Sequence, residues 1–303
     1  DEHTSRGLGD VYKRQTPAIT IAALKALEIF KDSNVDPILL ILSSDHEVKD
    51  NKKFQLSIQK SIKIAQKNNL VIFGVLPTYP ATGYGYIKSE SELNHDDFID
   101  TKVEHFTEKP DKDTAEIFIR DKKYSWNSGM FVFKASSILN EIKSFTPNIL
   151  INCKKSLKKS IKDLDFIRID KNSFINCENI PIDIAVFEKT KKAFVIPLDC
   201  GWNDIGSWES LWEISKKDLE GNSISGRALV QETKHSLIRS EDKLVVSIGL
   251  ENVVIVETKD AVLVTKKGFS QSLKDTISSM KSKGLNEAEI HKKVHRPWGS
   301  FLS

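Results

Sequence analysis

The sequence predicts an α/β fold, a parallel sheet covered by helices, followed by a smaller all-β segment. Three observations indicate this. Helix and strand patterns alternate from Thr16 to about residue 220, as they do in strand-helix-strand units with parallel strands. Strand candidates such as PILLILSS are continuously apolar, which is typical of strands buried on both faces. From Ser223 to Thr265 the pattern changes to short strands separated by turn residues.

The first part of the chain begins with a helix pattern. Residues 16–30 have a Thr cap, Pro at the first helical position and apolar residues at helical spacing. An apolar run at 37–44, a helical pattern at 54–69 and a second apolar run at 70–77 then form one strand-helix-strand unit. Further strands are expected at 84–89, 102–109, 129–135 and 193–199, and further helices at 113–121, 135–145 and 181–190.

The second part is expected to be mostly β. Its strand patterns lie at 227–233, 244–249, 253–258 and 261–265, and the helical pattern at 270–284 ends at a Gly in the position of a C-cap. The expected domains are therefore an N-terminal stretch unrelated to the fold at 1–15, an α/β domain at 16–220, a small β-rich domain with a terminal helix at 221–290, and a tail at 291–303.

The composition gives no sign of a nucleic-acid or membrane partner. The net charge of the 303 residues is +3, and acidic and basic residues are interspersed. The basic run CKKSLKKSIKD at 153–163 is interpreted as a solvated helix face. No apolar run approaches the roughly 20 residues that cross a bilayer, no signal-peptide pattern opens the chain, and the three cysteines form no C-x-x-C pair. We expect a cytoplasmic protein with reduced thiols.

Two acidic residues follow strand patterns at the carboxyl edge of the expected sheet, where ligands of open parallel α/β sheets gather. Asp45 follows the strand at 37–44, and Asp204 follows the strand at 193–199, within DCGWNDIGSWESLW. Mg²⁺ takes carboxylates together with substrate phosphates, so these two residues predict a phosphate-metal site. Capping of a turn or helix is the alternative for both. His46 is interpreted either as a packed side chain or as a ligand.

A second group of candidates suits a polar substrate. Gly85, in TGYGYI, permits positive φ or the close approach of a flat ligand to the backbone. In FTEKPD, Pro110 ends a strand, so Lys109 could hold a phosphate and Glu108 could accept hydroxyl hydrogen bonds. A plain surface ion pair is the alternative for those two. Asn127, just before a buried strand, can both donate and accept hydrogen bonds.

Six motifs, in their order and spacing, resemble the bacterial mannose-1-phosphate guanylyltransferases, a family of sugar-phosphate nucleotidyltransferases. They are LSSDH, TGYGYI, FTEKPD, WNSGMFVFKAS, IDIAVFEKT and DCGWNDIGSWESLWE. The resemblance runs from about Thr16 to the last residue. It implies a doubly wound, mostly parallel core with a small C-terminal β-helix-like domain, and the synthesis of GDP-mannose and pyrophosphate from GTP and mannose 1-phosphate.

The resemblance also implies roles for the candidate residues. Asp45 and Asp204 would hold Mg²⁺, Gly85, Glu108 and Asn127 would contact the mannose, and Lys109 would contact its phosphate. A sugar-phosphate oxygen would attack the α-phosphorus of GTP in line, so Asp45, Lys109 and Asp204 become the catalytic candidates. Catalysis of this kind is largely positioning and charge neutralisation, and it needs no covalent nucleophile.

The sequence departs from the family at both ends. Members open with a strand and a Gly-rich loop that cradles the nucleotide phosphates, and residues 1–15 offer neither. A catalytically impaired fragment, or a relative with another base preference, therefore stays open as an alternative. The tail VHRPWGSF resembles the start of a cupin-like isomerase domain without its metal-binding histidines, so isomerase activity is not expected. The β-rich domain is the candidate interface for a homodimer.

Overall fold

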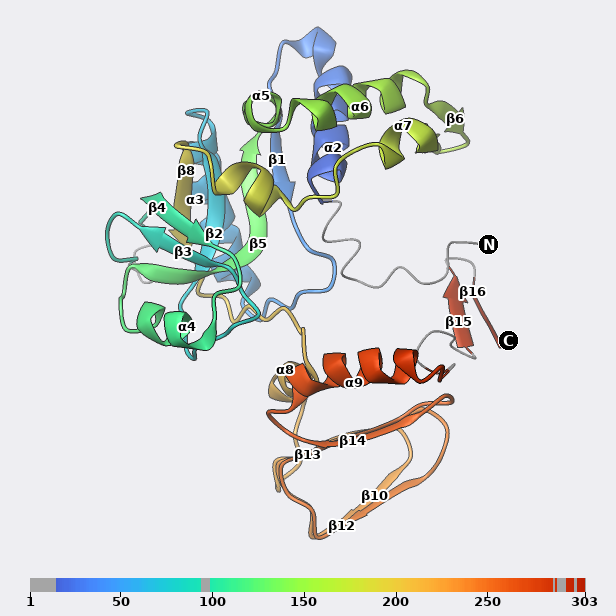
Figure 1. Cartoon of the computed structure of the whole chain (residues 1–303). Helices are drawn as coiled ribbons and strands as arrows, with labels where there is room; N and C mark the ends of the chain where they lie inside the picture. The colour runs from blue at the N-terminus through green and yellow to red at the C-terminus, as the bar shows by residue number, and fades with distance from the viewer. Residues whose placement is uncertain (1–14, 94–98, 286, 288–292, 297–298, 303) are drawn as a thin grey trace. The chain divides into compact units, whose positions relative to one another are not determined.

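The computed structural model describes residues 15–93, 99–285, 287, 293–296 and 299–302 (Figure 1). The chain divides into two compact units, of which the first ends at Trp202 and the second begins at Asn203. The expected domain boundary at residues 220 and 221 stays a prediction. The N-terminal stretch, 1–15, lies outside the described residues except for Gln15, which begins a helix.

The first unit is built on a six-stranded sheet with the strand order β1-β5-β2-β8-β4-β3. The strands are β1 (Ile38–Ile41), β2 (Leu70–Val75), β3 (Tyr86–Ser89), β4 (Thr101–Thr107), β5 (Tyr124–Lys134) and β8 (Ala193–Pro197). β2 pairs with β8 in parallel, whereas β5 is antiparallel to β1, β2 and β3, and β4 is antiparallel to β3 and β8. The sheet is therefore mixed, because β1, β2, β3 and β8 run in one direction and β4 and β5 run in the opposite direction.

The reason lies in the position of β5. β1 and β2 run in the same direction, as expected for strands joined by a helix, here α3 (Asn51–Ala65). β5 lies between them and is antiparallel to both. A strand-helix-strand pattern predicts the direction of its two strands, but it does not predict whether a later strand inserts between them.

Helices cover both faces of this sheet, so the α/β class is confirmed (Figure 1). Alternate residues of β2 face opposite ways. Leu70 and Ile72 belong to a core cluster with residues of α2 (Gln15–Ile29), α5 (Ala135–Phe145) and α6 (Pro147–Lys158). Val71 and Phe73 belong to a second cluster with residues of α3. β2 is thus buried on both faces, as its continuous apolar run predicted.

Shorter elements complete the first unit. They are the 3₁₀ turn η1 (Lys31–Ser33), α4 (Lys112–Phe118), the hairpin of β6 (Ile161–Asp163) and β7 (Phe166–Arg168), α7 (Lys171–Ile175) and the π-helical turn η2 (Asp183–Phe187). The basic run at 153–163 is helical only as far as Lys158, and its last three residues form β6. Lys154, Lys155 and Lys158 are exposed, as a solvated helix face requires.

The second unit is a small stack of parallel strands. Its strands are β9 (Ser223–Ser225), β10 (Ala228–Gln231), β11 (Leu237–Ser240), β12 (Val245–Ile248), β13 (Val253–Glu257) and β14 (Val262–Lys266). β9, β11 and β13 pair in parallel, β10 pairs with β12 in parallel, and β14 closes the stack antiparallel to β13. Parallel stacking of short strands that follow one another along the chain is typical of a β-helix, so the β-helix-like domain that the family resemblance implied is confirmed.

Two helices and a hairpin accompany the stack. The helices are α8 (Trp208–Ile214) and α9 (Ser270–Ser282), and β15 (Lys293–Arg296) pairs antiparallel with β16 (Gly299–Leu302). No helix in the described part of the chain is long and apolar enough to cross a membrane.

Candidate functional site

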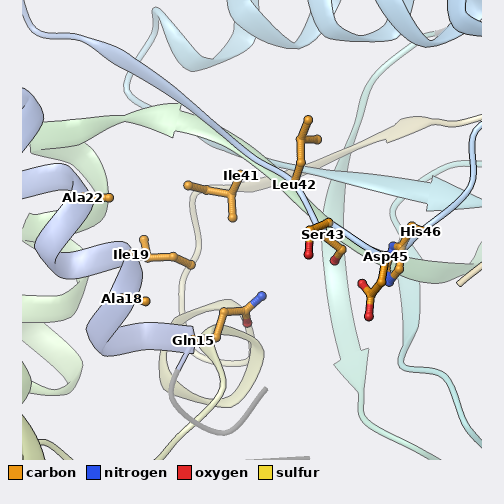
Figure 2. Close-up of a pocket in the computed structure, with 10 residues that line it drawn as sticks. Gln15, Ala18, Ile19, Ala22, Ile41, Leu42, Ser43, Asp45 and His46 are labelled. Carbon is orange, nitrogen blue, oxygen red and sulfur yellow. The ribbon is translucent and has the colours of Figure 1, made fainter. Parts of the chain in front are cut away.

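A pocket of about 510 Å³ lies between the start of α2 and the carboxyl end of β1 (Figure 2). Its volume is in the range of small-molecule sites. The helix side of the wall is largely apolar, and the loop after β1 forms a polar end with Ser43, Asp45 and His46. The full lining is Gln15, Ala18, Ile19, Ala22, Ile41, Leu42, Ser43, Ser44, Asp45 and His46.

Asp45 lies in this loop, as expected from the sequence, and its side chain is exposed. His46 beside it is a packed side chain. The indole N–H of Trp202 donates to His46 Nδ1 over 3.1 Å, and the two rings meet edge to face with centroids 5.4 Å apart. Because Nδ1 accepts this bond, the proton of the neutral imidazole is on Nε2.

The three predicted sugar-contact residues meet in a second place, which we call the Gly85 cluster (Gly85, Glu108 and Asn127). A Cβ built on Gly85 would lie 2.7 Å from Glu108 Oε2, 2.9 Å from Phe106 Cζ and 3.4 Å from Asn127 Cβ. The Asn127 backbone N–H donates to the Gly85 carbonyl over 2.8 Å. Position 85 therefore needs glycine for close approach, and a contact of this cluster with a sugar stays a prediction.

Sheet pairing explains why these residues meet. β3 lies between β4 and β5, and Tyr86 is opposite both Thr107 and Trp126. The residues next to these three, namely Gly85, Glu108 and Asn127, are consequently brought together from segments far apart in the sequence. Their spacing along the chain gave no indication of this contact.

The amide of Asn127 is held at both ends. Its Oδ1 accepts the backbone N–H of Gly129 over 2.8 Å, and its Nδ2 donates to Asp183 Oδ1 over 2.9 Å. β5 has a bulge here, because Ile72 of β2 pairs with Phe131 whereas Gly74 pairs with Asn127, which leaves extra residues on β5. Gly129, within the bulge, has φ of +70°. Bulges of this kind re-aim side chains, and glycine adopts this φ without steric cost.

Asp183 is a residue that the sequence reasoning missed. It is fully buried and begins η2. The available signal was a lone carboxylate inside the otherwise apolar stretch IDIAVF. A buried carboxylate requires compensating hydrogen bonds, and such a residue is therefore a marker of a specific polar contact.

Lys109 and Glu108 form an ion pair at the end of β4. The Glu108 side chain is only 16% exposed and the Lys109 side chain is 52% exposed, so this is not a plain surface pair. Partial desolvation, followed by the charge of Glu108, raises the pKa of the nearby Glu188. Glu188 was also missed, and it lies at the end of η2, the turn that Asp183 begins.

Asp204 belongs to the second unit and does not cap a helix. The cap of α8 is Ser207, whose hydroxyl accepts the backbone N–H of Ser210 over 3.0 Å. The Asp204 carboxylate instead accepts the backbone N–H of Gly206 over 3.2 Å, within a turn where Ile205 has φ of +50°. Left-handed backbone at a β-branched residue is strained, and strain of this kind gathers at functional sites.

The donor chemistry fits a hard cation that is completed by substrate. Among the described residues, no group of three or more His, Cys, Asp or Glu could hold a metal ion. An exposed carboxylate such as Asp45 at the end of a pocket can supply one oxygen ligand and leave the others to phosphates. The pairing of Asp45 with Asp204 stays a prediction.

The cysteines are buried and unsuited to nucleophilic chemistry. Burial, followed by the charge of Asp199, raises the pKa of Cys200 to about 12. A thiol in this state is almost entirely protonated at neutral pH, and the thiolate is the reactive form.

Comparison with known proteins yields two family matches. The model for nucleotidyl transferases matches residues 11–221, and the model for the MannoseP isomerase/GMP-like beta-helix domain matches residues 226–280. Mannose-1-phosphate guanylyltransferase of Escherichia coli K12 is 39% identical over 96% of this chain and 61% of its own length. The xanthan biosynthesis protein XanB of Xanthomonas campestris is 43% identical over 96% of this chain and 60% of its own length.

The chain spans about three fifths of the length of the curated relatives it matches. A solved structure from Thermus thermophilus, described as a mannose-1-phosphate geranyltransferase, superposes with a TM-score of 0.74 at 24% identity. The match covers 88% of this chain and 75% of the Thermus chain. At that identity the similarity establishes the fold.

Proposed function

The chain belongs to the nucleotidyl transferase family, and on this premise we propose that it acts in the joining of GTP and mannose 1-phosphate to give GDP-mannose and pyrophosphate. The observation that carries the proposal is the meeting of Gly85, Glu108 and Asn127 beside buried Asp183. Relatives named for this reaction are 39% and 42% identical to the chain over the aligned three fifths of their length, which supports mannose as the sugar.

On the sugar side, the roles follow from hydrogen-bonding capacity. Glu108 accepts hydrogen bonds from hydroxyls, and Asn127 can donate and accept. Gly85 allows Glu108 and Asn127 to come close together, because a Cβ at position 85 would collide with Glu108 and Phe106. A polyhydroxylated ligand matches the hydrogen-bonding capacity of Glu108 and Asn127.

On the phosphate side, Lys109 supplies the positive charge. Its left-handed backbone, with φ of +47°, follows Glu108 directly, and its side chain is half exposed. An ammonium group acts as a point charge on a phosphate. When mannose 1-phosphate binds, we expect Lys109 to exchange part of its interaction with Glu108 for the phosphate.

Asp45 and Asp204 are the proposed ligands of a divalent cation, for which we favour Mg²⁺. The cation would neutralise phosphate charge on the nucleotide as pyrophosphate leaves. In the reaction, an oxygen of mannose 1-phosphate forms a bond to the α-phosphorus of GTP while the bond to the pyrophosphate oxygen breaks. The protein residues orient the sugar and its phosphate for this in-line displacement.

The test uses the chain of residues 1–303 and separates binding from turnover. Calorimetric titration with mannose 1-phosphate, glucose 1-phosphate, GTP and UTP measures selectivity, and pyrophosphate release measures transfer. We expect mannose 1-phosphate to bind more tightly than glucose 1-phosphate. Equal affinity for both sugar phosphates, or no binding of either, would contradict the proposal.

The same experiment distinguishes the alternatives. Sugar-phosphate binding without pyrophosphate release is the outcome for a catalytically impaired fragment. Release with UTP in preference to GTP is the outcome for a relative with a different base preference. A cytoplasmic location is part of the proposal, because GTP and sugar phosphates are cytoplasmic metabolites, and a homodimer stays a prediction.

A further inference from the structure

A buried hydrogen bond joins Asn127 to Asp183, two residues 56 positions apart. Asp183 is fully buried, Asn127 is 9% exposed, and Nδ2 and Oδ1 lie 2.9 Å apart. The bond crosses from β5 to η2 and links Asp183 to the Gly85 cluster through Asn127. A buried carboxylate is costly to maintain unless it is hydrogen-bonded, so its presence calls for an explanation beyond packing.

The two partners of Asn127 fix the orientation of its amide. A carboxylate at Asp183 only accepts, so it must face the NH₂ end. The backbone N–H of Gly129 only donates, so it must face the carbonyl end, and it does so over 2.8 Å. If the amide were flipped, its oxygen would face the Asp183 carboxylate, which is also an acceptor. Its NH₂ group would face the Gly129 N–H, which is also a donor.

With both partners in place, Asn127 keeps a defined capacity for a ligand. One Nδ2 hydrogen and one lone pair of Oδ1 are not used by Asp183 and Gly129. This remaining donor and acceptor, at fixed positions, are complementary to sugar hydroxyls, which also donate and accept hydrogen bonds. Glu108 also lies beside Gly85, and its carboxylate only accepts.

We infer that Asp183 is a positioning residue for sugar specificity, which locks the Asn127 amide so that its remaining donor and acceptor face the sugar hydroxyls in one orientation. This inference rests on the proposed function, since it assumes that the Gly85 cluster binds the sugar. In this proposal Asp183 acts on the sugar through Asn127.

The segment around Asp183 is anchored to the start of α2 at the pocket. The backbone N–H of Ile182 donates to Gln15 Oε1 over 3.4 Å, and the Thr16 hydroxyl donates to the Ile180 carbonyl over 2.7 Å. Gln15 also lines the pocket. Asp183 is therefore held in place by a neighbouring helix, which is the property that a positioning residue requires.

The first variant is Asp183→Asn, with the exposed Glu178→Gln of the same segment as the matched control. An amide at 183 can either donate or accept, so Asn127 is no longer held in one orientation. We expect the affinity for mannose 1-phosphate to fall about tenfold, as for loss of a hydrogen bond to a charged group. GTP affinity should stay within about twofold, and Glu178→Gln should change neither.

The second variant reverses the pair, Asn127→Asp with Asp183→Asn. The hydrogen bond can re-form with the amide on position 183, so thermal stability should return toward the wild-type value. Sugar affinity should stay low, because the sugar would then meet a carboxylate in place of an amide. If the reversed pair restores both stability and sugar affinity, Asp183 has only a structural role and the inference is overturned.

A spectroscopic readout covers the case in which Asp183→Asn does not fold. In the wild-type protein the side-chain NH₂ of Asn127, assigned by its absence in Asn127→Ser, should show slow exchange of one proton and should shift when mannose 1-phosphate is added. Rapid exchange of both protons would show that the Asn127 amide is not held in one orientation, and it would overturn the inference. Wild-type protein that binds no sugar phosphate would overturn the proposed function, whereas equal sugar binding by wild type and Asp183→Asn would overturn the inference alone.

Discussion

The Gly85 cluster and the polar end of the pocket differ in how tightly their residues are held. In the cluster, a single added Cβ at position 85 would collide with Glu108 and Phe106, and the Asn127 amide has a partner at each end. At the pocket end, Asp45 is exposed on a loop after β1. The Gly85 cluster is therefore a tightly held set of polar groups, whereas the polar end of the pocket carries a carboxylate that solvent and ligands can reach.

This difference matches two kinds of ligand. Recognition of a sugar depends on fixed donors and acceptors, because epimers such as mannose and glucose differ only in the direction of one hydroxyl. A hydrated cation with phosphates requires charge and access, and it completes its own coordination sphere. Substitutions in the cluster should therefore alter geometry and stability, whereas those at the pocket end should alter charge and leave the fold unchanged.

The largest expected effect follows from removing the charge of Asp45. Asp45→Asn should lower pyrophosphate release about 100- to 1000-fold, because cation binding stabilises phosphoryl transfer by several kcal/mol. The free energy of unfolding should change by less than about 0.5 kcal/mol, since the side chain is exposed. Electron paramagnetic resonance of Mn²⁺ bound with GTP gives a second readout that does not need turnover.

Exposed Asp165→Asn is the matched control for Asp45→Asn and should change neither measurement. Unaltered Mn²⁺ binding and release in Asp45→Asn would remove the residue from the metal site. Mn²⁺ binding and pyrophosphate release measured for Asp204→Asn test whether Asp45 and Asp204 bind the same ion.

Lys109→Ala should produce the next largest effect. Loss of a charge-assisted contact is worth roughly 1.5–3 kcal/mol, so mannose 1-phosphate should bind about ten- to a hundredfold more weakly while GTP is spared. Lys112→Ala, at a side chain that is 75% exposed, is the control. Calorimetry measures both ligands, and a similar loss for GTP would contradict the placement of Lys109 at the sugar phosphate.

Gly85→Ala tests the crowding of the cluster. The added methyl would lie 2.7 Å from Glu108 Oε2, so side chains must shift, and overpacking of this kind costs about 1–3 kcal/mol. Gly83→Ala is a close control in the same segment, because a Cβ there has no atom within 4 Å. Urea denaturation compares the two, and equal stability would show that the cluster is looser than its contacts indicate.

The smallest expected effect concerns Glu188. Partial desolvation, followed by the charge of Glu108, raises its pKa in the folded protein, so the folded state binds the proton more tightly than the unfolded state does. Stability therefore falls as pH rises from the ordinary pKa of 4.5 through the raised value. Glu188→Gln should stabilise the protein at pH 7, by less than about 0.5 kcal/mol because the side chain is exposed.

At a pH about one unit below the ordinary pKa, where the carboxyl is protonated in both states, the difference between Glu188→Gln and wild type should vanish. Urea denaturation at the two pH values measures it, with Glu178→Gln as the control. A stabilisation that is equal at both pH values would mean that the effect comes from something other than the charge of Glu188.

The sequence by itself determined the kinds of elements and most of the candidate residues. Continuous apolar runs located the strands at Leu70–Val75 and Ala193–Pro197, and helical periodicity located α2, α3 and α5. Glycine, glutamate and asparagine at positions 85, 108 and 127 stood out because each lies at the end of a strand pattern and offers either close backbone approach or hydrogen bonding. These signals are local, since they depend on the burial and backbone preference of a few neighbouring residues.

Only the tertiary structure decided which of these residues meet. The insertion of β5 between β1 and β2, the bond from Asn127 to Asp183, and the contact of Trp202 with His46 join residues far apart in the chain. Ser207, not Asp204, caps α8, although both residues can form a cap. Local patterns specify how a segment folds and which face it buries, whereas strand order and buried hydrogen bonds depend on how all segments share one core.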